Sequence, residues 1–258
     1  MSGHVIVLDD DEETGRRLKY YSRAADVVYW TELWRAGEWR YERALEGHLP
    51  HHLRSTFGRF VPPGARVLEA GAGRGHFTVA AHARGYRAEG LDWSAETVTE
   101  LRRRFPEIPW HVGDVRKLEF PDRTFDAVYS PGVCEHFEEG PSEILLETFR
   151  VLRPGGVAVV VTPCFNRWMR ARPELFPGDG RGAGDFYQFA FSPEGMTALL
   201  GRLGFDVVRV RLYDTVDTMI KFAGWQVPRW AVKPLAIMDY LPVLRKWGRC
   251  CVWVARRP

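Results

Sequence analysis

Cysteine is scarce in this sequence. Only four occur among 258 residues, and no two of them have the spacing of a C-x-x-C pair. We therefore expect no disulfide framework, but a reduced, cytoplasmic protein in which cysteine serves as a small apolar residue. The four are Cys134, Cys164, Cys250 and Cys251.

Long apolar runs and a strong excess of charge are also absent. No stretch approaches the roughly 18 apolar residues that a membrane-spanning helix needs. The N-terminal stretch MSGHVIVLDDDEETG has no basic region and no long apolar core, so we expect no signal peptide. The formal net charge of +3 is too small to indicate a nucleic-acid partner.

The chain is long enough for one α/β domain with additional segments. We expect the acidic stretch Asp9–Glu13 to be a loose tail, and the chain from about Arg16 to Phe60 to be helical. The stretch V-P-P-G at Val61–Gly64 ends this region. The sequence thus divides into a tail with a helical segment over 1–60 and a second domain over 61–258.

From Arg66 onward, short apolar runs alternate with helical patterns, which predicts parallel βαβ units in a doubly wound α/β sheet. Two segments interrupt the alternation and are read as insertions. One covers about 164–188 and is rich in Gly, Pro and Arg, and the other covers about 215–248 and is rich in Trp, Pro and basic residues. The expected strands are RVLEA, YRAEGLD, WHVGD, FDAVYS, VAVVVTP, FDVVRVRLY and CCVWVARR.

The turn after the first of these strands contains three alternating glycines in VLEAGAGRGHF. A dinucleotide fingerprint would need a third glycine at position 76, where the chain has His76. A phosphate loop would need a Lys-Ser or Lys-Thr pair, which does not follow. The pattern E-x-G-x-G-x-G at the end of a strand instead favours a cationic ligand. The alternative is a tight turn without a ligand.

Acidic residues end the first three strands, where such a ligand would bind. We expect Glu69 to hold an ammonium group, directly or through water, and Asp92 to accept from two ribose hydroxyls. Asp114 would meet an adenine edge, with Trp93 and Val115 on either side of the ring. The alternatives are a helix cap for Asp92 and a turn role for Asp114.

In these segments the sequence resembles the class I S-adenosylmethionine-dependent methyltransferases, particularly the small-molecule branch that includes the ubiquinone and menaquinone methyltransferases. VLEAGAGRGHF, LDWS, GDVRKLEFPDRTFDAVYS and RVLRPGGVAVVVTP occur in the order and spacing of the family. The resemblance covers about Arg66 to Pro163 and, more weakly, Phe191 to Leu212. It implies a Rossmann-like sheet of seven strands, of which the last, CCVWVARR, is antiparallel. It also implies S-adenosyl-L-methionine as the cofactor, with contacts from Glu69, Gly71, Ala72, Gly73, Gly75, Asp92, Trp93, Asp114, Val115 and Ser130.

The stretch SPGVCEHF follows the fourth strand, where the family places residues beside the methyl group. Some quinone-type members hold a divalent metal there with an acid three residues before the Glu-His pair, but this chain has Gly132 at that position. Two ligands make a poor Mg²⁺ site, so we expect no metal. His136 is a candidate general base and Glu135 a second candidate catalytic residue. Alternatively, both only shape the loop.

The segments outside the motifs bear on the acceptor. The family often covers its substrate with an N-terminal helical lid, for which Tyr20, Tyr21, Trp30 and Trp34 are candidates, with a core role as the alternative. For 215–248 we favour a roof over the substrate pocket, with a membrane-interface segment or a partner surface as alternatives. The chain lacks the (N/D)PP(Y/F) tetrapeptide of the methyltransferases that act on exocyclic amines of DNA, so we expect no nucleic acid.

The function expected is methyl transfer from S-adenosylmethionine to a small-molecule acceptor. We favour O-methylation of a secondary metabolite, a sugar or a lipid-linked compound. The alternatives are an N- or C-methyltransferase, a membrane-surface enzyme acting on quinones or lipids, and a non-catalytic regulatory subunit with this fold. The acids Glu69, Asp92 and Asp114 favour an enzyme, and the sequence does not indicate an oligomeric state.

Overall fold

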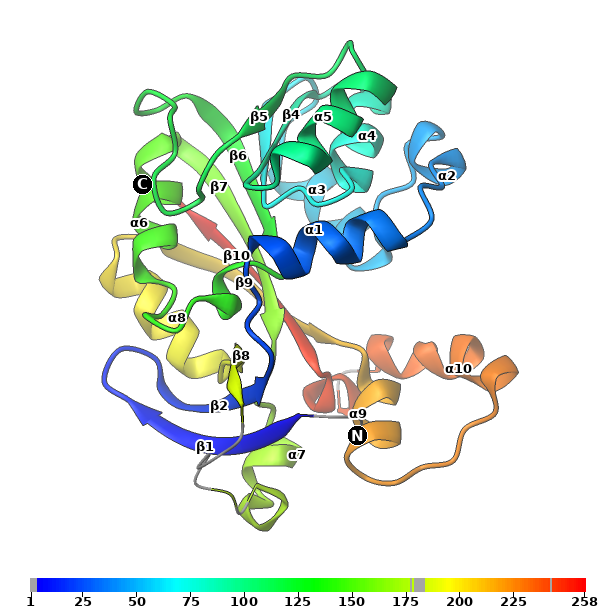
Figure 1. The fold of residues 1–258 in the computed structure, drawn as a ribbon. Helices are drawn as coiled ribbons and strands as arrows, with labels where there is room; N and C mark the ends of the chain where they lie inside the picture. Colours follow the sequence, from blue (N-terminus) through cyan, green and yellow to red (C-terminus); the bar gives the residue numbers. More distant parts are fainter. Residues whose placement is uncertain (1–3, 177, 179–183, 242) are drawn as a thin grey trace.

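A computed structural model describes residues 4–176, 178, 184–241 and 243–258 (Figure 1). Seven strands form the central sheet in the order β5-β4-β3-β6-β7-β10-β9. All neighbouring pairs from β5 to β7 are parallel, whereas β10 runs antiparallel to both of its neighbours. The predicted fold class and the antiparallel last strand are therefore confirmed. The strands are β3 (Arg66–Ala70), β4 (Arg87–Asp92), β5 (Trp110–Val112), β6 (Phe125–Pro131), β7 (Leu152–Pro163), β9 (Asp206–Tyr213) and β10 (Cys250–Arg256).

Apolar side chains cover both faces of this sheet, as a parallel sheet requires. Successive residues of a strand point to opposite faces. Val67 accordingly belongs to one buried cluster, and its neighbour Leu68 belongs to the other. Four main helices pack on these clusters (Figure 1). They are α4 (His76–Ala83), α5 (Ala95–Arg104), α6 (Ser142–Val151) and α8 (Pro193–Arg202).

The strand order reverses at β3. The chain runs outward from β3 to β4 and β5 and then returns to β6 on the other side of β3. At such a switch point the turns after the two central strands diverge and leave a crevice at their carboxyl ends. The glycine turn after β3 and the stretch SPGVCEHF after β6 therefore face the same crevice, although 60 residues separate Gly71 from Pro131 in the chain.

The expectation for the N-terminal region is wrong in its first part. Instead of a loose tail and a helix, β1 (Val5–Asp11) and β2 (Gly15–Ser22) form an antiparallel hairpin. β2 also pairs with β8 (Asp185–Ala190), so the hairpin and the first insertion together form a second sheet of three strands. The rest of the region is helical as expected, in α1 (Val27–Ala36), α2 (Glu42–Leu45) and α3 (His51–Phe60).

Cross-strand charge pairs explain why the acidic stretch is ordered. Asp9 lies opposite Arg17 in the hairpin and accepts from its Nε at 2.6 Å. The Oδ1 atom of Asp11 accepts from the backbone N–H of Thr14 at 2.7 Å and so stabilises the turn. Leu18 is fully buried two residues before Tyr20, which is also buried, as in a half-buried strand. Asp9, Asp10 and Asp11 thus lie in a strand, and Glu12 and Glu13 lie in the turn that follows it, not in a loose tail.

The second insertion forms a lobe beside the main sheet, which we call the late lobe and define as residues 215–248. It contains α9 (Thr215–Lys221), α10 (Arg229–Leu235), η3 (Ala236–Tyr240) and η4 (Leu244–Trp247). In Figure 1 its outer part, around α10, projects away from the sheet. The buried carboxylate of Asp239 accepts from the N–H groups of Asp214 and Thr215 at 3.0 and 2.9 Å, which ties η3 to the start of α9. Within the part of the chain that the structure describes, no helix combines the length and apolar character needed to cross a membrane.

Candidate functional site

A cleft of about 460 Å³ opens at the switch point and is called the first cavity here. Seven of the ten predicted cofactor contacts line it, and three do not. Those in its wall come from β3, from the end of β4 and from the turns that follow β3, β4 and β5. They are Glu69, Gly71, Ala72, Gly73, Asp92, Trp93 and Val115, whereas Gly75, Asp114 and Ser130 lie outside the wall.

The glycine turn is fixed by its neighbours on three sides. The N–H groups of Gly71 and Ala72 both donate to the carbonyl of Leu91, at 2.9 and 2.8 Å. A Cβ atom on Gly71 would lie 2.3 Å from the side chain of Val133, and one on Gly73 would lie 2.9 Å from the ring of Trp34. Both glycines also have positive φ, +83° and +50°. No larger residue fits at Gly71 or Gly73, because these two positions lie directly against the loop after β6 and against α1.

Asp92 connects the glycine turn to the end of β4. Its Oδ2 accepts from Gly73 N–H at 2.8 Å, and its Oδ1 accepts from Ser94 N–H at 3.0 Å. The helix cap is Ser94, whose side chain accepts from Thr97 N–H, so Asp92 is not needed as a cap. Burial raises the pKa of Asp92. Each carboxylate oxygen has a second lone pair, so Asp92 keeps acceptor capacity for a hydroxyl ligand in the first cavity.

Glu69 is buried in the wall of the first cavity with one oxygen engaged. Its Oε2 accepts from both the N–H and the hydroxyl of Thr78, at 3.0 and 2.5 Å. Burial raises the pKa of Glu69 to about 8, and the nearby carboxylate of Asp92 acts in the same direction. A cation beside a carboxyl lowers its pKa. The carboxyl group of Glu69 therefore fits a ligand that brings a positive charge, such as the ammonium group of an amino acid.

The three predicted contacts outside the wall have other surroundings. Gly75 has φ +65° at the start of α4, and a Cβ atom there would lie 2.4 Å from the ring of Trp110, so its smallness serves packing. Asp114 pairs with the guanidinium of Arg116 at 2.7 Å. Ser130 is buried on β6, and its hydroxyl has no hydrogen-bond partner among the described residues.

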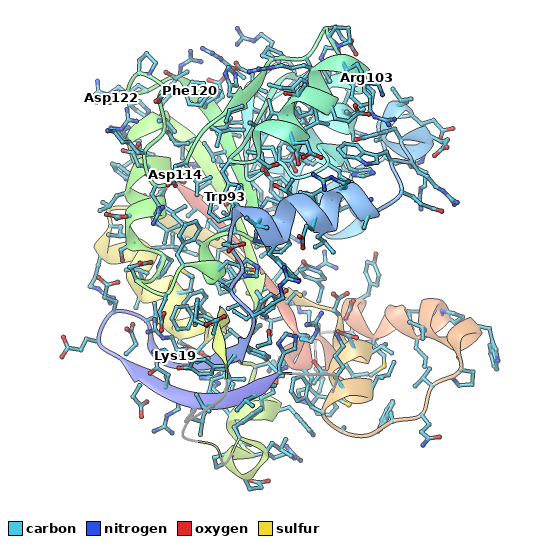
Figure 2. The ribbon with its side chains drawn as sticks, viewed as in Figure 1. Lys19, Trp93, Arg103, Asp114, Phe120 and Asp122 are labelled. Atoms are coloured by element: carbon cyan, nitrogen blue, oxygen red, sulfur yellow. The ribbon has the colours of Figure 1, made fainter. Side chains whose placement is uncertain are left out.

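An aromatic ring links Trp93 to the Asp114 region. Phe137 lies 6.0 Å from the ring of Trp93, and the guanidinium of Arg116 lies 4.9 Å from the Phe137 ring. Figure 2 shows Trp93 and Asp114 in the same part of the molecule. Both follow the carboxyl end of a strand, Trp93 after β4 and Asp114 after β5. Trp93 and Val115 both line the first cavity, as expected for residues on either side of a flat ring.

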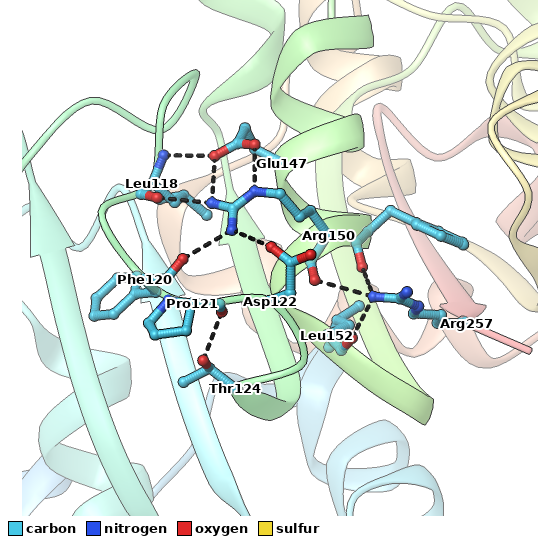
Figure 3. A network of polar contacts seen from close by, with 10 residues as sticks. Leu118, Phe120, Pro121, Asp122, Thr124, Glu147, Arg150, Leu152 and Arg257 are labelled. Atoms are coloured by element: carbon cyan, nitrogen blue, oxygen red, sulfur yellow. Dashed lines mark hydrogen bonds and ion pairs between the residues drawn. The ribbon is translucent and has the colours of Figure 1, made fainter.

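A polar network around Arg150 holds the chain that follows Val115 (Figure 3). Its guanidinium bonds Glu147, the carboxylate of Asp122 and the carbonyls of Leu118 and Phe120, at 2.7 to 2.8 Å. Glu147 also accepts from the N–H of Leu118 at 2.7 Å. Glu147 and Arg150 both lie on α6. Their hydrogen bonds to Leu118 and Phe120 therefore fix the loop that follows Val115 against the body of the domain.

Two of the four predicted lid residues cover the first cavity. Trp30 and Trp34 lie on α1, stack on each other at 5.4 Å and line the first cavity. Helix α1 is attached to α5, because Thr31 and Ser94 share a hydrogen bond of 2.8 Å. Tyr20 and Tyr21 lie on β2, so their assignment to a helical lid is wrong. Tyr20 lines a different cavity, and the ring of Tyr21 contacts Phe186 at 6.5 Å.

The second cavity has a volume of about 670 Å³ and adjoins the first. Tyr129, Pro131 and Gly132, at the end of β6, line both. Its other walls come from distant parts of the chain and combine aromatic with charged and apolar residues. They include Tyr20 from β2, Glu135 from η1 (Cys134–His136), Tyr187 from β8, Tyr213 from β9, Phe222 after α9 and Arg249 before β10.

His136 and Glu135 are adjacent in the chain but line different cavities. His136 lines the first, and its Nδ1 lies 2.8 Å from the carbonyl of Tyr187. Because a carbonyl only accepts, Nδ1 carries the proton and Nε2 carries the lone pair. Burial lowers the pKa of His136 to about 4, so the ring is neutral at pH 7.

Glu135 lines the second cavity and is almost wholly buried. Its Oε2 has no hydrogen-bond partner among the described residues. Burial raises the pKa of Glu135 to about 8. At pH 7 this carboxyl is mainly protonated and carries an O–H donor. Among the described residues, no group of three or more His, Cys, Asp or Glu side chains is arranged to hold a metal ion.

Sequence reasoning missed most of the second cavity. Tyr187 lies in the first insertion, and its only signal is the strand-like alternation of D-F-Y-Q-F-A. Lys221 and Arg249 also line this cavity and both pair with Asp217. No local pattern indicates that these residues converge, because the contacts depend on how three separate segments pack.

Comparison with known proteins agrees with this geometry. Residues 68–160 match the family described as "Methyltransferase domain". A probable S-adenosylmethionine-dependent methyltransferase of Mycolicibacterium smegmatis is 36% identical over 146 residues, which cover 56% of this chain and 53% of that protein. A ubiquinone/menaquinone biosynthesis C-methyltransferase of Desulfotalea psychrophila is 34% identical over 134 residues, covering 50% and 49%. The chain thus spans about half the length of these curated relatives.

A solved structure shares the fold across most of the chain. The geranyl diphosphate C-methyltransferase of Streptomyces coelicolor, crystallised with Mg²⁺, a substrate analogue and S-adenosyl-L-homocysteine, has a TM-score of 0.55 and 19% identity. The match covers 80% of this chain and 74% of that one. The matched family is consistent with the strand order of the sheet and with the glycine turn that lies between Glu69 and Asp92. The matched region, residues 68–160, thus carries a methyltransferase domain, and the sheet as a whole has the fold of the solved methyltransferase structure.

Proposed function

We propose that the first cavity binds S-adenosylmethionine and that the chain transfers its methyl group to a small-molecule acceptor in the second cavity. When bound, the cofactor supplies an electrophilic methyl group on a positively charged sulfur. The observation that carries the proposal is the wall shared by the two cavities at Tyr129, Pro131 and Gly132. An acceptor in the second cavity is thereby held next to a ligand in the first.

The main catalytic contribution of the chain is positioning. Holding two reactants in line can supply about 7–11 kcal/mol of the barrier without any proton transfer. The hydrogen bonds of Asp92 to Gly73 and Ser94 fix the cofactor side in advance. On the acceptor side, the rings of Tyr20 and Tyr187 favour a partly apolar molecule.

We further propose oxygen as the acceptor atom. A hydroxyl acceptor must lose its proton, and the unprotonated Nε2 of His136 could receive it only from an acceptor that reaches past the shared wall into the first cavity, where its pKa of about 4 makes the ring a weak base. The protonated carboxyl of Glu135 could donate a hydrogen bond to a second oxygen of the same acceptor. The competing candidate is transfer to carbon, which the name of the Desulfotalea psychrophila relative favours.

Two experiments test these proposals in sequence. Titration calorimetry with S-adenosylhomocysteine should show binding, and NAD at the same concentration should not bind. The chain with S-(¹³C-methyl)-labelled cofactor is then incubated with metabolite extracts, and the products are examined by NMR. A new methyl signal in the methoxy region supports transfer to oxygen, whereas one in the aryl or alkyl methyl region would replace that assignment with C-methylation. Binding of NAD without binding of S-adenosylhomocysteine would refute the cofactor assignment.

A further inference from the structure

The late lobe exposes an unusual amount of apolar surface. The four most exposed large apolar side chains of the described chain all belong to it. Trp230 is 79% exposed, Val243 69%, Ile237 64% and Tyr240 61%, and Trp225 and Leu241 are each 47% exposed. Clustering of this kind, unlike single exposed apolar residues, indicates a surface that is covered in use.

In the outer part of the late lobe, residues 225–248, the described side chains that are both charged and exposed are basic. Residues 225–248 include four basic residues, Arg229, Lys233, Arg245 and Lys246, and a single acid, Asp239. Asp239 is 3% exposed, and backbone N–H groups occupy its carboxylate. Among the described side chains of 225–248, the exposed ones therefore combine tryptophan, tyrosine and aliphatic groups with the basic groups of Arg245 and Lys246, and none of them is an acid.

We propose that the late lobe docks on an anionic lipid surface, with Trp230, Ile237, Tyr240 and Val243 inserted among the headgroups. Tryptophan and tyrosine favour the boundary between water and acyl chains, and nearby basic residues are attracted by acidic headgroups. A second copy of the chain is a poorer occupant, because a symmetric contact would bring two basic faces together.

The base of the lobe connects this surface to the second cavity. Lys221, at the end of α9, and Phe222, directly after it, line the second cavity, while the exposed residues begin three positions later at Trp225. Docking would thus bring the second cavity close to the bilayer, where an acceptor dissolved in lipid could enter. That entry route rests on the proposed function, whereas the docking itself does not.

Vesicle flotation of the full chain tests the docking without any assay of activity. Vesicles of phosphatidylcholine with about one third phosphatidylserine should bind the protein at low salt, and binding should weaken at physiological salt. Pure phosphatidylcholine vesicles should bind at least about tenfold more weakly. Absence of binding to the anionic vesicles at low salt would overturn the proposal.

Substitutions at exposed positions locate the contact. Trp230→Asp and Val243→Asp should each weaken binding by at least about tenfold, because each replaces an inserted apolar group by a charge repelled by the lipid. The matched control is Leu146→Asp on α6, where a half-exposed leucine far from the lobe in sequence should have no effect. An equal loss in this control would overturn the proposal.

A charge reversal gives a second, milder test should an aspartate disturb the fold of the lobe. Lys246→Glu changes the surface by two charges, each worth about fivefold in affinity, so binding to anionic vesicles should fall by roughly twenty-five-fold. Binding to neutral vesicles should not fall. Sedimentation velocity completes the test, because self-association abolished by Trp230→Asp would identify a second copy as the occupant and overturn the assignment to lipid.

Discussion

Replacing Asp92 by alanine should weaken the binding of S-adenosylhomocysteine by about tenfold to more than a hundredfold. Asp92 lies at the end of β4 in the wall of the first cavity, and its carboxylate is the expected acceptor for two ribose hydroxyls. A hydrogen bond to a charged group contributes about 1.5–3 kcal/mol. Losing one such bond accounts for the lower bound and losing both for the upper.

The same substitution has a structural cost that must be separated from binding. Asp92→Ala leaves the N–H groups of Gly73 and Ser94 without their acceptors. Each unpaired buried donor costs about 1–3 kcal/mol, and for a chain of this size 1 kcal/mol lowers the Tm by about 2–4 °C. The variant should therefore melt several degrees lower yet remain folded at 25 °C. Asp114→Ala is the matched control, because Asp114 lies outside the cavity wall and pairs with exposed Arg116, so affinity should change less than about threefold.

A ligand that lacks the ribose hydroxyls distinguishes a direct contact from a loosened turn. Calorimetry is carried out with S-adenosylhomocysteine and with its dideoxyribose analogue, on the wild type and on Asp92→Ala. If Asp92 accepts from the hydroxyls, the wild type should prefer the natural ligand strongly and the variant should prefer it only weakly. An equal preference in both proteins would refute the contact and leave Asp92 a purely structural residue of the glycine turn.

Four further outcomes are expected. Because the pKa of Glu69 is raised to about 8, binding of a cationic ligand at pH 7 should release up to about one proton. Calorimetry in buffers of different ionisation enthalpy measures this release, and Glu69→Gln should abolish it. Without ligand, the raised pKa stabilises the fold below about pH 4.5 and this contribution is lost as the pH rises through about 8, so Glu69→Gln should flatten that part of the stability profile. His136→Ala should slow methyl transfer by about 10²–10⁴-fold with little change in cofactor affinity if it removes the acceptor proton, and a loss under about threefold would leave positioning as the main term. EDTA should not reduce turnover, and activity that is lost with EDTA and restored by Mg²⁺ would contradict the expectation of no metal.

The central sheet could be predicted because its signals are local. Each strand is a short apolar run bounded by turn residues, and the glycine turn directly follows β3. Even so, the sequence could not indicate why Gly73 must be glycine. The reason is the ring of Trp34, which reaches the turn from α1. Gly75, read as a ligand contact from its spacing, has a packing role against Trp110.

The N-terminal hairpin was mispredicted because its signals are not local. The acids of Asp9–Glu13 resemble a solvated stretch when read alone, and Asp9, Asp10 and Asp11 are neutralised by Arg16 and Arg17 of the opposite strand. The aromatic residues after Arg16 suggested a helix, yet the burial of Leu18 and Tyr20 follows the period of a strand. β2 also needs β8 as its neighbour, and that strand lies more than 160 residues further along the chain.

Most of the site residues that the sequence predicts line the first cavity, and most of the residues that it misses line the second. The region matching the methyltransferase domain, residues 68–160, supplies most of the wall of the first cavity. The second cavity is built largely from outside it, with Tyr20 before the region and Tyr187, Phe222 and Arg249 after it. The match to the methyltransferase domain therefore bears mainly on the first cavity, and most of the proposed acceptor cavity lies outside it. Substitutions at Tyr20, Tyr187 or Phe222 should therefore alter which acceptor is used with little change in cofactor affinity, and among the matched residues Glu135 should behave in the same way because it lines the second cavity.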